Sequence, residues 1–143
     1  QAQEHPDYYL RIVDRRDDGI VVRGAKIHTS VSTNTDEIIV LPTRAMREGD
    51  EDYAVAFAVP AATKGVKLLA SSYGGFERND FEYPISAKHK MMETLTVFDD
   101  VFVPWERVFL AGEVAAACLM ALKRSVEVSN RQACASRPMR ELI

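Results

Sequence analysis

The sequence predicts a mainly β protein: an antiparallel β-barrel or sandwich of about seven to eight strands, followed by one C-terminal helix. Short segments rich in β-branched and aromatic residues recur at intervals of roughly 8–12 residues, and turn residues separate them. Strong helix formers then dominate from residue 113 onward. We therefore expect a β-barrel domain over residues 1–112, and over residues 113–143 a helical segment that begins a further helical domain.

The alternation of large and small side chains over residues 53–60 is the clearest strand signal. Tyr53, Val55, Phe57 and Val59 would share one face, and three alanines would share the other. This period of two is typical of a strand whose second face lies against a close neighbour.

Turn and breaker residues set the predicted limits of the other elements. Asp17-Asp18-Gly19 has the composition of a tight hairpin turn. Gly24 is expected to mark a bulge or a close backbone approach, and Asp99-Asp100 is expected to interrupt a strand. Strands are expected over residues 8–14, 20–27, 37–42, 53–60, 65–70, 93–98, 101–104 and 105–110, and the helix over residues 113–136.

Composition excludes several functional classes. The chain has 143 residues, 47% hydrophobic and 27% charged, with a net charge of −3, which suits one globular domain. Lys and Arg do not cluster, so no nucleic-acid partner is expected, and no apolar run approaches the roughly 20 residues of a membrane span. The two cysteines, Cys118 and Cys134, are too few for a structural metal site. With a polar N-terminal segment, they predict free thiols in a reducing, cytoplasmic compartment.

The segment Thr29–Thr35 is the first candidate functional feature, because six of its seven residues are small or polar. Hydroxyl groups donate and accept, so such a run can bind the edge of a polar heteroaromatic ring. The same composition also suits an ordinary solvated loop, and the pattern by itself favours the loop.

Two titratable residues accompany this run. His28 stands at its start, where it is either a ligand contact or an ordinary surface side chain. Glu93 follows Met91-Met92 at the start of a predicted strand. It is either a carboxylate in apolar surroundings, suited to act as a base, or a solvent-facing strand residue.

Three segments of the chain together resemble a known protein family. They are Asp18-Gly19-Ile20-Val21-Val22-Arg23-Gly24-Ala25-Lys26, Asp52-Tyr53-Ala54-Val55-Ala56-Phe57-Ala58-Val59-Pro60 and Phe98-Asp99-Asp100-Val101-Phe102-Val103-Pro104-Trp105-Glu106-Arg107-Val108. The family is the 4-hydroxyphenylacetate 3-hydroxylase / 4-hydroxybutyryl-CoA dehydratase family. The resemblance extends over about residues 7–113, and its most specific part is the third segment.

The resemblance implies the acyl-CoA dehydrogenase architecture, in which this region is a middle β-domain between two helical domains. It implies FAD as cofactor, bound between the β-domain and the helical domains, a small aromatic or acyl-CoA substrate, and a homo-oligomer. His28, Thr29 and Ser30 would line the flavin, with Ser30 at the position of a flavin-contacting threonine. Glu93 would match an active-site glutamate of the dehydratase branch.

The resemblance implies two reactions, and a third possibility stays open. The expected one is that of a flavin-dependent 4-hydroxyphenylacetate 3-monooxygenase, and the alternative is that of a 4-hydroxybutyryl-CoA dehydratase/vinylacetyl-CoA isomerase. The dehydratase branch has a His-Arg-Gln run where this chain has Asn130-Arg131-Gln132, and Cys134 follows too soon to match the next cluster cysteine. A non-catalytic β-barrel binding module is the third possibility, and the β-domain alone is expected to be inactive.

Overall fold

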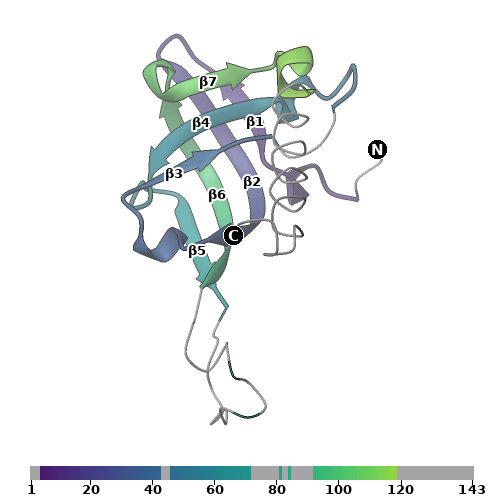
Figure 1. The fold of residues 1–143 in the computed structure, drawn as a ribbon. Helices are drawn as coiled ribbons and strands as arrows, with labels where there is room; N and C mark the ends of the chain where they lie inside the picture. The colour runs from purple at the N-terminus through teal and green to yellow at the C-terminus, as the bar shows by residue number, and fades with distance from the viewer. Residues whose placement is uncertain (1–3, 43–45, 72–80, 82–83, 85–91, 119–143) are drawn as a thin grey trace, which may run out of the picture.

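The computed structural model describes residues 4–42, 46–71, 81, 84 and 92–118. Its strands form two antiparallel sheets (Figure 1). One short 3₁₀ turn precedes the first strand, and three others connect strands. The strands are β1 (Arg11–Arg15), β2 (Gly19–Ser30), β3 (Glu37–Val40), β4 (Val55–Pro60), β5 (Val66–Ala70), β6 (Glu93–Pro104) and β7 (Val108–Ala111), and the 3₁₀ turns are η1 (Pro6–Tyr8), η2 (Ser32–Asn34), η3 (Glu51–Tyr53) and η4 (Trp105–Arg107).

The two sheets pack face to face around one apolar core. The four-stranded sheet has the order β1-β2-β6-β5 and the three-stranded sheet the order β3-β4-β7. No strand ladder joins them into a closed barrel within the described part of the chain. The mainly β prediction is therefore confirmed, in its sandwich form.

Phe57 and Phe98 join the two sheets at the centre of the core. Phe57 lies on β4 and Phe98 on β6, and both are almost fully buried. Their ring centroids are 5.6 Å apart at an interplanar angle of 86°, an edge-to-face contact. The alternation predicted for residues 53–60 is confirmed over β4, since Val55, Phe57 and Val59 all belong to this core. It is wrong for Tyr53, which lies in the 3₁₀ turn η3 before the strand.

The alanine face of β4 lies beneath the start of the C-terminal helix. Ala54 and Ala56 form a second cluster with Leu110 and Ala117. Residues 114–118 are helical, so the helix begins where the sequence predicts it, and its predicted continuation to residue 136 lies outside the described residues. The predicted division into two domains at residue 112 stays a prediction.

Strands β2 and β6 form the longest ladder and contain two bulges. The ladder joins Gly19 with Pro104 at one end and Ser30 with Glu93 at the other. In the first bulge, Asp99 and Asp100 of β6 lie opposite Arg23 of β2.

The predicted interruption at Asp99-Asp100 is therefore wrong, because the strand continues through a bulge at this point. Asp100 has a φ of 51°, and its carboxylate accepts two hydrogen bonds from Arg23, at 2.7 and 2.8 Å. Lys67 of β5 binds the Asp99 carboxylate at 2.7 Å. Each aspartate thus has a cationic partner on a neighbouring strand, which offsets the poor strand propensity of both residues.

In the second bulge, Ile27 and His28 of β2 lie opposite Leu95 of β6. His28 adopts a φ of 57° there, a left-handed conformation that is uncommon outside glycine. A residue held in such a conformation needs support from its surroundings.

Gly24 marks a close backbone approach, one of the two roles predicted for it. Its φ is 126°, and a Cβ atom at this position would lie 2.4 Å from the Tyr9 carbonyl oxygen. Only glycine at this position of β2 lets the segment that precedes β1 lie this close without displacing main-chain atoms.

Among the described residues, no helix has the length and apolar character needed to cross a membrane.

Candidate functional site

The end of the β2–β6 ladder brings three of the four predicted site residues together. Ser30 and Glu93 are the terminal pair of the ladder, and the Ser30 hydroxyl donates a hydrogen bond of 2.7 Å to Glu93 Oε1. His28 Nδ1 lies 3.4 Å from the other carboxylate oxygen, Glu93 Oε2. His28 and Ser30 thus form one polar group with Glu93, which is more than 60 residues away in the chain. We call this group the Glu93 site.

The carboxylate of Glu93 is only partly satisfied. Its Oε2 atom is buried and accepts no hydrogen bond from the described residues, although the side chain as a whole is 29% exposed. The His28 side chain is 81% exposed, so its ring is accessible to a ligand. An oxygen without a partner beside an accessible imidazole is a place where a proton or a hydrogen-bond donor can be accepted.

Thr29, the fourth predicted site residue, points to the opposite side of the sheet. Its hydroxyl accepts a hydrogen bond of 3.1 Å from Thr96. Its carbonyl lies 3.1 Å from Thr94 Oγ1 and 3.2 Å from Ser32 Oγ. Ser32 and Thr94 are in turn 2.6 Å apart. The Thr29 side chain is thus engaged on the buried side, whereas its neighbours His28 and Ser30 project outward.

The rest of the hydroxyl run forms a local turn. Val31 has a φ of 61°, and its amide donates to the Met92 carbonyl at 2.9 Å. Ser32 to Asn34 then make the 3₁₀ turn η2. The loop interpretation therefore describes the segment after Ser30, while Thr29 and Ser30 belong to strand β2.

Sequence reasoning did not single out Thr94 and Thr96, whose hydroxyls contact Thr29 on the buried side of the sheet. Both are nearly inaccessible, with 3% and 1% exposure. A signal was present, because Thr94 and Thr96 have the same strand parity as Phe98, a core residue. Two hydroxyl residues on the buried face of a strand need partners there.

Apolar side chains lie next to the Glu93 site on the outer face of the four-stranded sheet. Leu69 and Leu95 oppose one another across β5 and β6, and Leu95 has the same strand parity as Glu93. Ile27, in the bulge, is 70% exposed, and Leu69 is 53% exposed. An apolar strip beside a few hydrogen-bonding groups is the usual composition of a site for a flat organic ligand.

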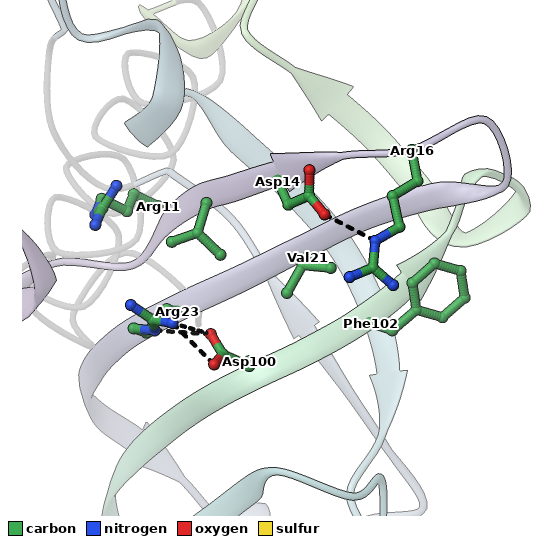
Figure 2. Close-up of a pocket in the computed structure, with 8 residues that line it drawn as sticks. Arg11, Asp14, Arg16, Val21, Arg23, Asp100 and Phe102 are labelled. Atoms are coloured by element: carbon green, nitrogen blue, oxygen red, sulfur yellow. Dashed lines mark hydrogen bonds and ion pairs between the residues drawn. The ribbon is translucent and has the colours of Figure 1, made fainter.

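A separate depression of about 460 Å³ lies on the same outer face, around the first bulge. Figure 2 shows Arg23 paired with Asp100 and Arg16 paired with Asp14 across its floor. The hydrogen bond from Arg23 keeps the pKa of Asp100 below its ordinary value. Because these charges neutralise one another and none of the predicted site residues lines the depression, we place the candidate site at Glu93. The residues that line it are Arg11, Val13, Asp14, Arg16, Val21, Arg23, Asp100 and Phe102.

No group of three or more potential metal ligands occurs within the described ranges. The donor set at the Glu93 site, one carboxylate, one imidazole and one hydroxyl, is suited to hydrogen bonding and proton exchange with an organic ligand.

Comparison with known proteins identifies relatives over most of the chain. It is 45% identical over 123 residues to 4-hydroxybutyryl-CoA dehydratase/vinylacetyl-CoA-Δ-isomerase of Clostridium aminobutyricum. This match covers 83% of this chain and 25% of that protein. It is 37% identical over 112 residues to the oxygenase component of 4-hydroxyphenylacetate 3-monooxygenase of Geobacillus sp. (strain PA-9), covering 77% and 23%. The chain thus spans about a quarter of the length of these curated relatives.

A solved structure shares the fold. The oxygenase component of 4-hydroxyphenylacetate 3-monooxygenase in complex with FAD superimposes with a TM-score of 0.66 at 37% sequence identity, covering 80% of this chain and 24% of the other. The family model for the N-terminal region of 4-hydroxyphenylacetate 3-hydroxylase matches residues 1–110. The chain therefore belongs to the 4-hydroxyphenylacetate 3-hydroxylase family, as its three sequence segments predict.

Proposed function

We propose that this chain supplies the β-domain wall of an FAD site in a flavin-dependent oxidoreductase. The observation that carries the proposal is the Glu93 site itself, where one carboxylate, one hydroxyl and one accessible imidazole meet beside an exposed apolar strip. A flavin ring has an apolar face and an edge of donors and acceptors, so this combination fits it. The FAD-bound relative supports the choice of cofactor.

In this proposal, His28 and Ser30 hold the polar edge of the flavin. Ser30 Oγ accepts as well as donates, and the imidazole of His28 offers a second donor or acceptor. Thr29 lies between them and would contact the flavin through its main chain, because its hydroxyl is bound by Thr96. When bound, FAD supplies the electron-transfer chemistry.

Glu93 is the proposed catalytic acid or base. Its Oε1 atom is held by Ser30, so the carboxylate has a fixed orientation. Its Oε2 atom, which has no hydrogen-bond partner among the described residues, is the position at which a substrate proton would be received. The nearby His28 Nδ1 would stabilise the carboxylate when the imidazole is charged.

The reaction we propose first is the hydroxylation of a small phenol, as in 4-hydroxyphenylacetate 3-monooxygenase. The relative from Geobacillus and the FAD-bound structure support it. The residue Asn130, where the dehydratase branch has a histidine, also favours it. Glu93 would accept the phenol proton. Residues outside the described ranges would supply the second wall of the site, and a homo-oligomer would complete it.

The second candidate is the dehydration or isomerisation of a hydroxyacyl-CoA. The observation that favours it is the 45% identity to the relative from Clostridium aminobutyricum, together with a glutamate at the position implied for that branch. Glu93 would then remove a proton from the acyl chain. Flanking coding sequence separates the two, because cysteines spaced for a cluster upstream would favour the dehydratase and their absence the monooxygenase.

Titration with FAD, followed by quenching of flavin fluorescence, tests the proposed wall. We expect micromolar binding, weakened about tenfold in Ser30→Ala, which corresponds to about 1.4 kcal/mol. Thr33→Ala is the matched control, because Thr33 is an exposed hydroxyl of the same run outside the Glu93 site. A folded chain that binds no FAD would contradict the proposal and favour a non-catalytic β-domain binding module.

A further inference from the structure

The buried side of the Glu93 site is held by a network of four hydroxyl groups. Ser32, Thr94 and Thr96 are 2%, 3% and 1% exposed, and each lies within hydrogen-bond distance of Thr29 or of another member. A buried hydroxyl without a partner is costly, so a fully connected network of this kind defines one geometry.

The single proton of each hydroxyl limits which bonds can form together. Thr96 donates to the Thr29 hydroxyl at 3.1 Å. Thr94 and Ser32 lie 3.1 and 3.2 Å from the Thr29 carbonyl and 2.6 Å from one another, and either hydroxyl can be the donor in the contact between them. Thr94 makes the shorter contact with the carbonyl and also pairs with Thr29 across the ladder, so we take it as the hydroxyl that holds the Thr29 main chain.

The position of Thr94 connects it to every residue of the site. On its own strand it is the neighbour of Glu93. Across the ladder it pairs with Thr29, which lies between His28 and Ser30. His28 is held at a φ of 57°, a strained conformation that persists only when the surroundings fix it. The bond from Thr94 to the Thr29 carbonyl fixes the residue next to it.

We propose that Thr94 is a positioning residue of the Glu93 site, which keeps His28 and Ser30 on the Glu93 carboxylate by holding the Thr29 carbonyl from the buried side. The catalytic meaning of this role rests on the proposed function, but the role itself concerns the geometry of the flavin-free protein. Thr94 touches neither the substrate nor the cofactor in this arrangement.

The test measures the conformation of His28 by NMR in the flavin-free chain. At positive φ the amide and Hα protons of a residue are close together, so His28 gives a strong intraresidue NOE. We expect this NOE to be lost in Thr94→Val, which removes the hydroxyl at nearly constant volume. It is retained in Thr94→Ser, which keeps the hydroxyl. It is also retained in the matched control Thr96→Val, which removes the bond to the Thr29 hydroxyl and the 3.3 Å contact with Thr94 but leaves Thr94 on the Thr29 carbonyl.

A retained NOE in a folded Thr94→Val protein would overturn the proposal. If that variant does not fold, Thr94→Ser and Ser32→Ala decide, because both leave a hydroxyl at position 94 and must keep the NOE. Its loss in Ser32→Ala would transfer the positioning role to Ser32. Flavin titration of the same variants is a second, independent measurement. We expect about tenfold weaker FAD binding in Thr94→Val and unchanged binding in Thr96→Val. If the wild-type chain binds no FAD, the proposed function fails and the NMR result still decides this inference.

Discussion

Ser30 and Glu93 close the β2–β6 ladder, and the Ser30 hydroxyl donates a hydrogen bond of 2.7 Å to the Glu93 carboxylate. Ser30→Ala removes this bond and leaves Oε1 without its donor. Because the pair is partly accessible to water, we expect a loss of about 1 kcal/mol in the free energy of unfolding. Urea unfolding measures it. Thr33→Ala serves as the control, with an expected change within about 0.5 kcal/mol; equal losses in the two variants would show that the Ser30–Glu93 bond contributes nothing.

Gly24 and Gly49 allow a comparison of steric contact at similar backbone angles. Their φ values are 126° and 95°. A Cβ at Gly24 would lie 2.4 Å from the Tyr9 carbonyl oxygen, whereas a Cβ at Gly49 would meet nothing within 4 Å. We expect Gly49→Ala to cost about 1 kcal/mol from the backbone alone, and Gly24→Ala to cost about 3 kcal/mol or more. Thermal and urea unfolding would reveal the difference, and similar costs at the two sites would refute the close approach.

The Phe57–Phe98 contact holds the two sheets together. Either residue changed to Ala should cost about 3–5 kcal/mol, because a large side chain leaves a cavity in a packed core. Milder changes to Leu permit a double-mutant cycle, with an expected coupling of about 0.5–1.5 kcal/mol for the edge-to-face pair. Phe109→Ala is the control, since Phe109 is 55% exposed, and we expect little effect there. Additive effects of the two Leu substitutions would show that the pair has no specific coupling.

The Arg23–Asp100 pair predicts a dependence of stability on pH. Hydrogen bonding from Arg23 lowers the pKa of Asp100 below its ordinary value of 3.8. A carboxyl whose pKa is lower in the folded state adds stability above its unfolded pKa, and this stability is lost as the pH falls through the folded pKa. Asp100→Asn should therefore be less stable than wild type near pH 7, and the difference should shrink below about pH 4.

Urea unfolding between about pH 3 and pH 7 measures this difference. In an Arg23→Gln background the partner is already absent, so Asp100→Asn should then have a smaller effect at every pH. A difference between Asp100→Asn and wild type that stays constant across the range would rule out this origin.

Much of the sandwich could be predicted because its determinants are local. The alternation of Val55, Phe57 and Val59 with alanines fixed both faces of β4, and the turn at Asp17-Asp18-Gly19 matched the β1–β2 hairpin. The prediction failed at Asp99-Asp100, where low strand propensity suggested a break. The partners that keep the strand intact, Arg23 and Lys67, are distant in sequence, so no local pattern contains them.

Only part of the candidate site could be predicted, because its contacts join residues that are distant in the sequence. Ser30 and Glu93 were each singled out, but their direct contact depends on the register of two strands that are more than 60 residues apart in the chain. The inward orientation of the Thr29 side chain depends on the bulge at Ile27 and His28, which no turn residue marks in the sequence. Strand parity with the core residue Phe98 predicts that Thr94 lies on the buried face.

The two bulges of the β2–β6 ladder couple the lengths of the two strands. The first adds a residue to β6 and the second adds one to β2, so the register is the same at the Gly19–Pro104 end and at the Ser30–Glu93 end of the ladder. A one-residue deletion in a regular part of either strand would shift the far end of the ladder by one position and turn Ser30 and Glu93 to opposite faces. Removal of the extra residue of a bulge would instead leave a regular ladder, with the residue pairs on both sides of it unchanged. The Ser30–Glu93 pairing can thus survive the loss of a residue at a bulge, whereas a loss between the bulges needs a matching loss on the partner strand.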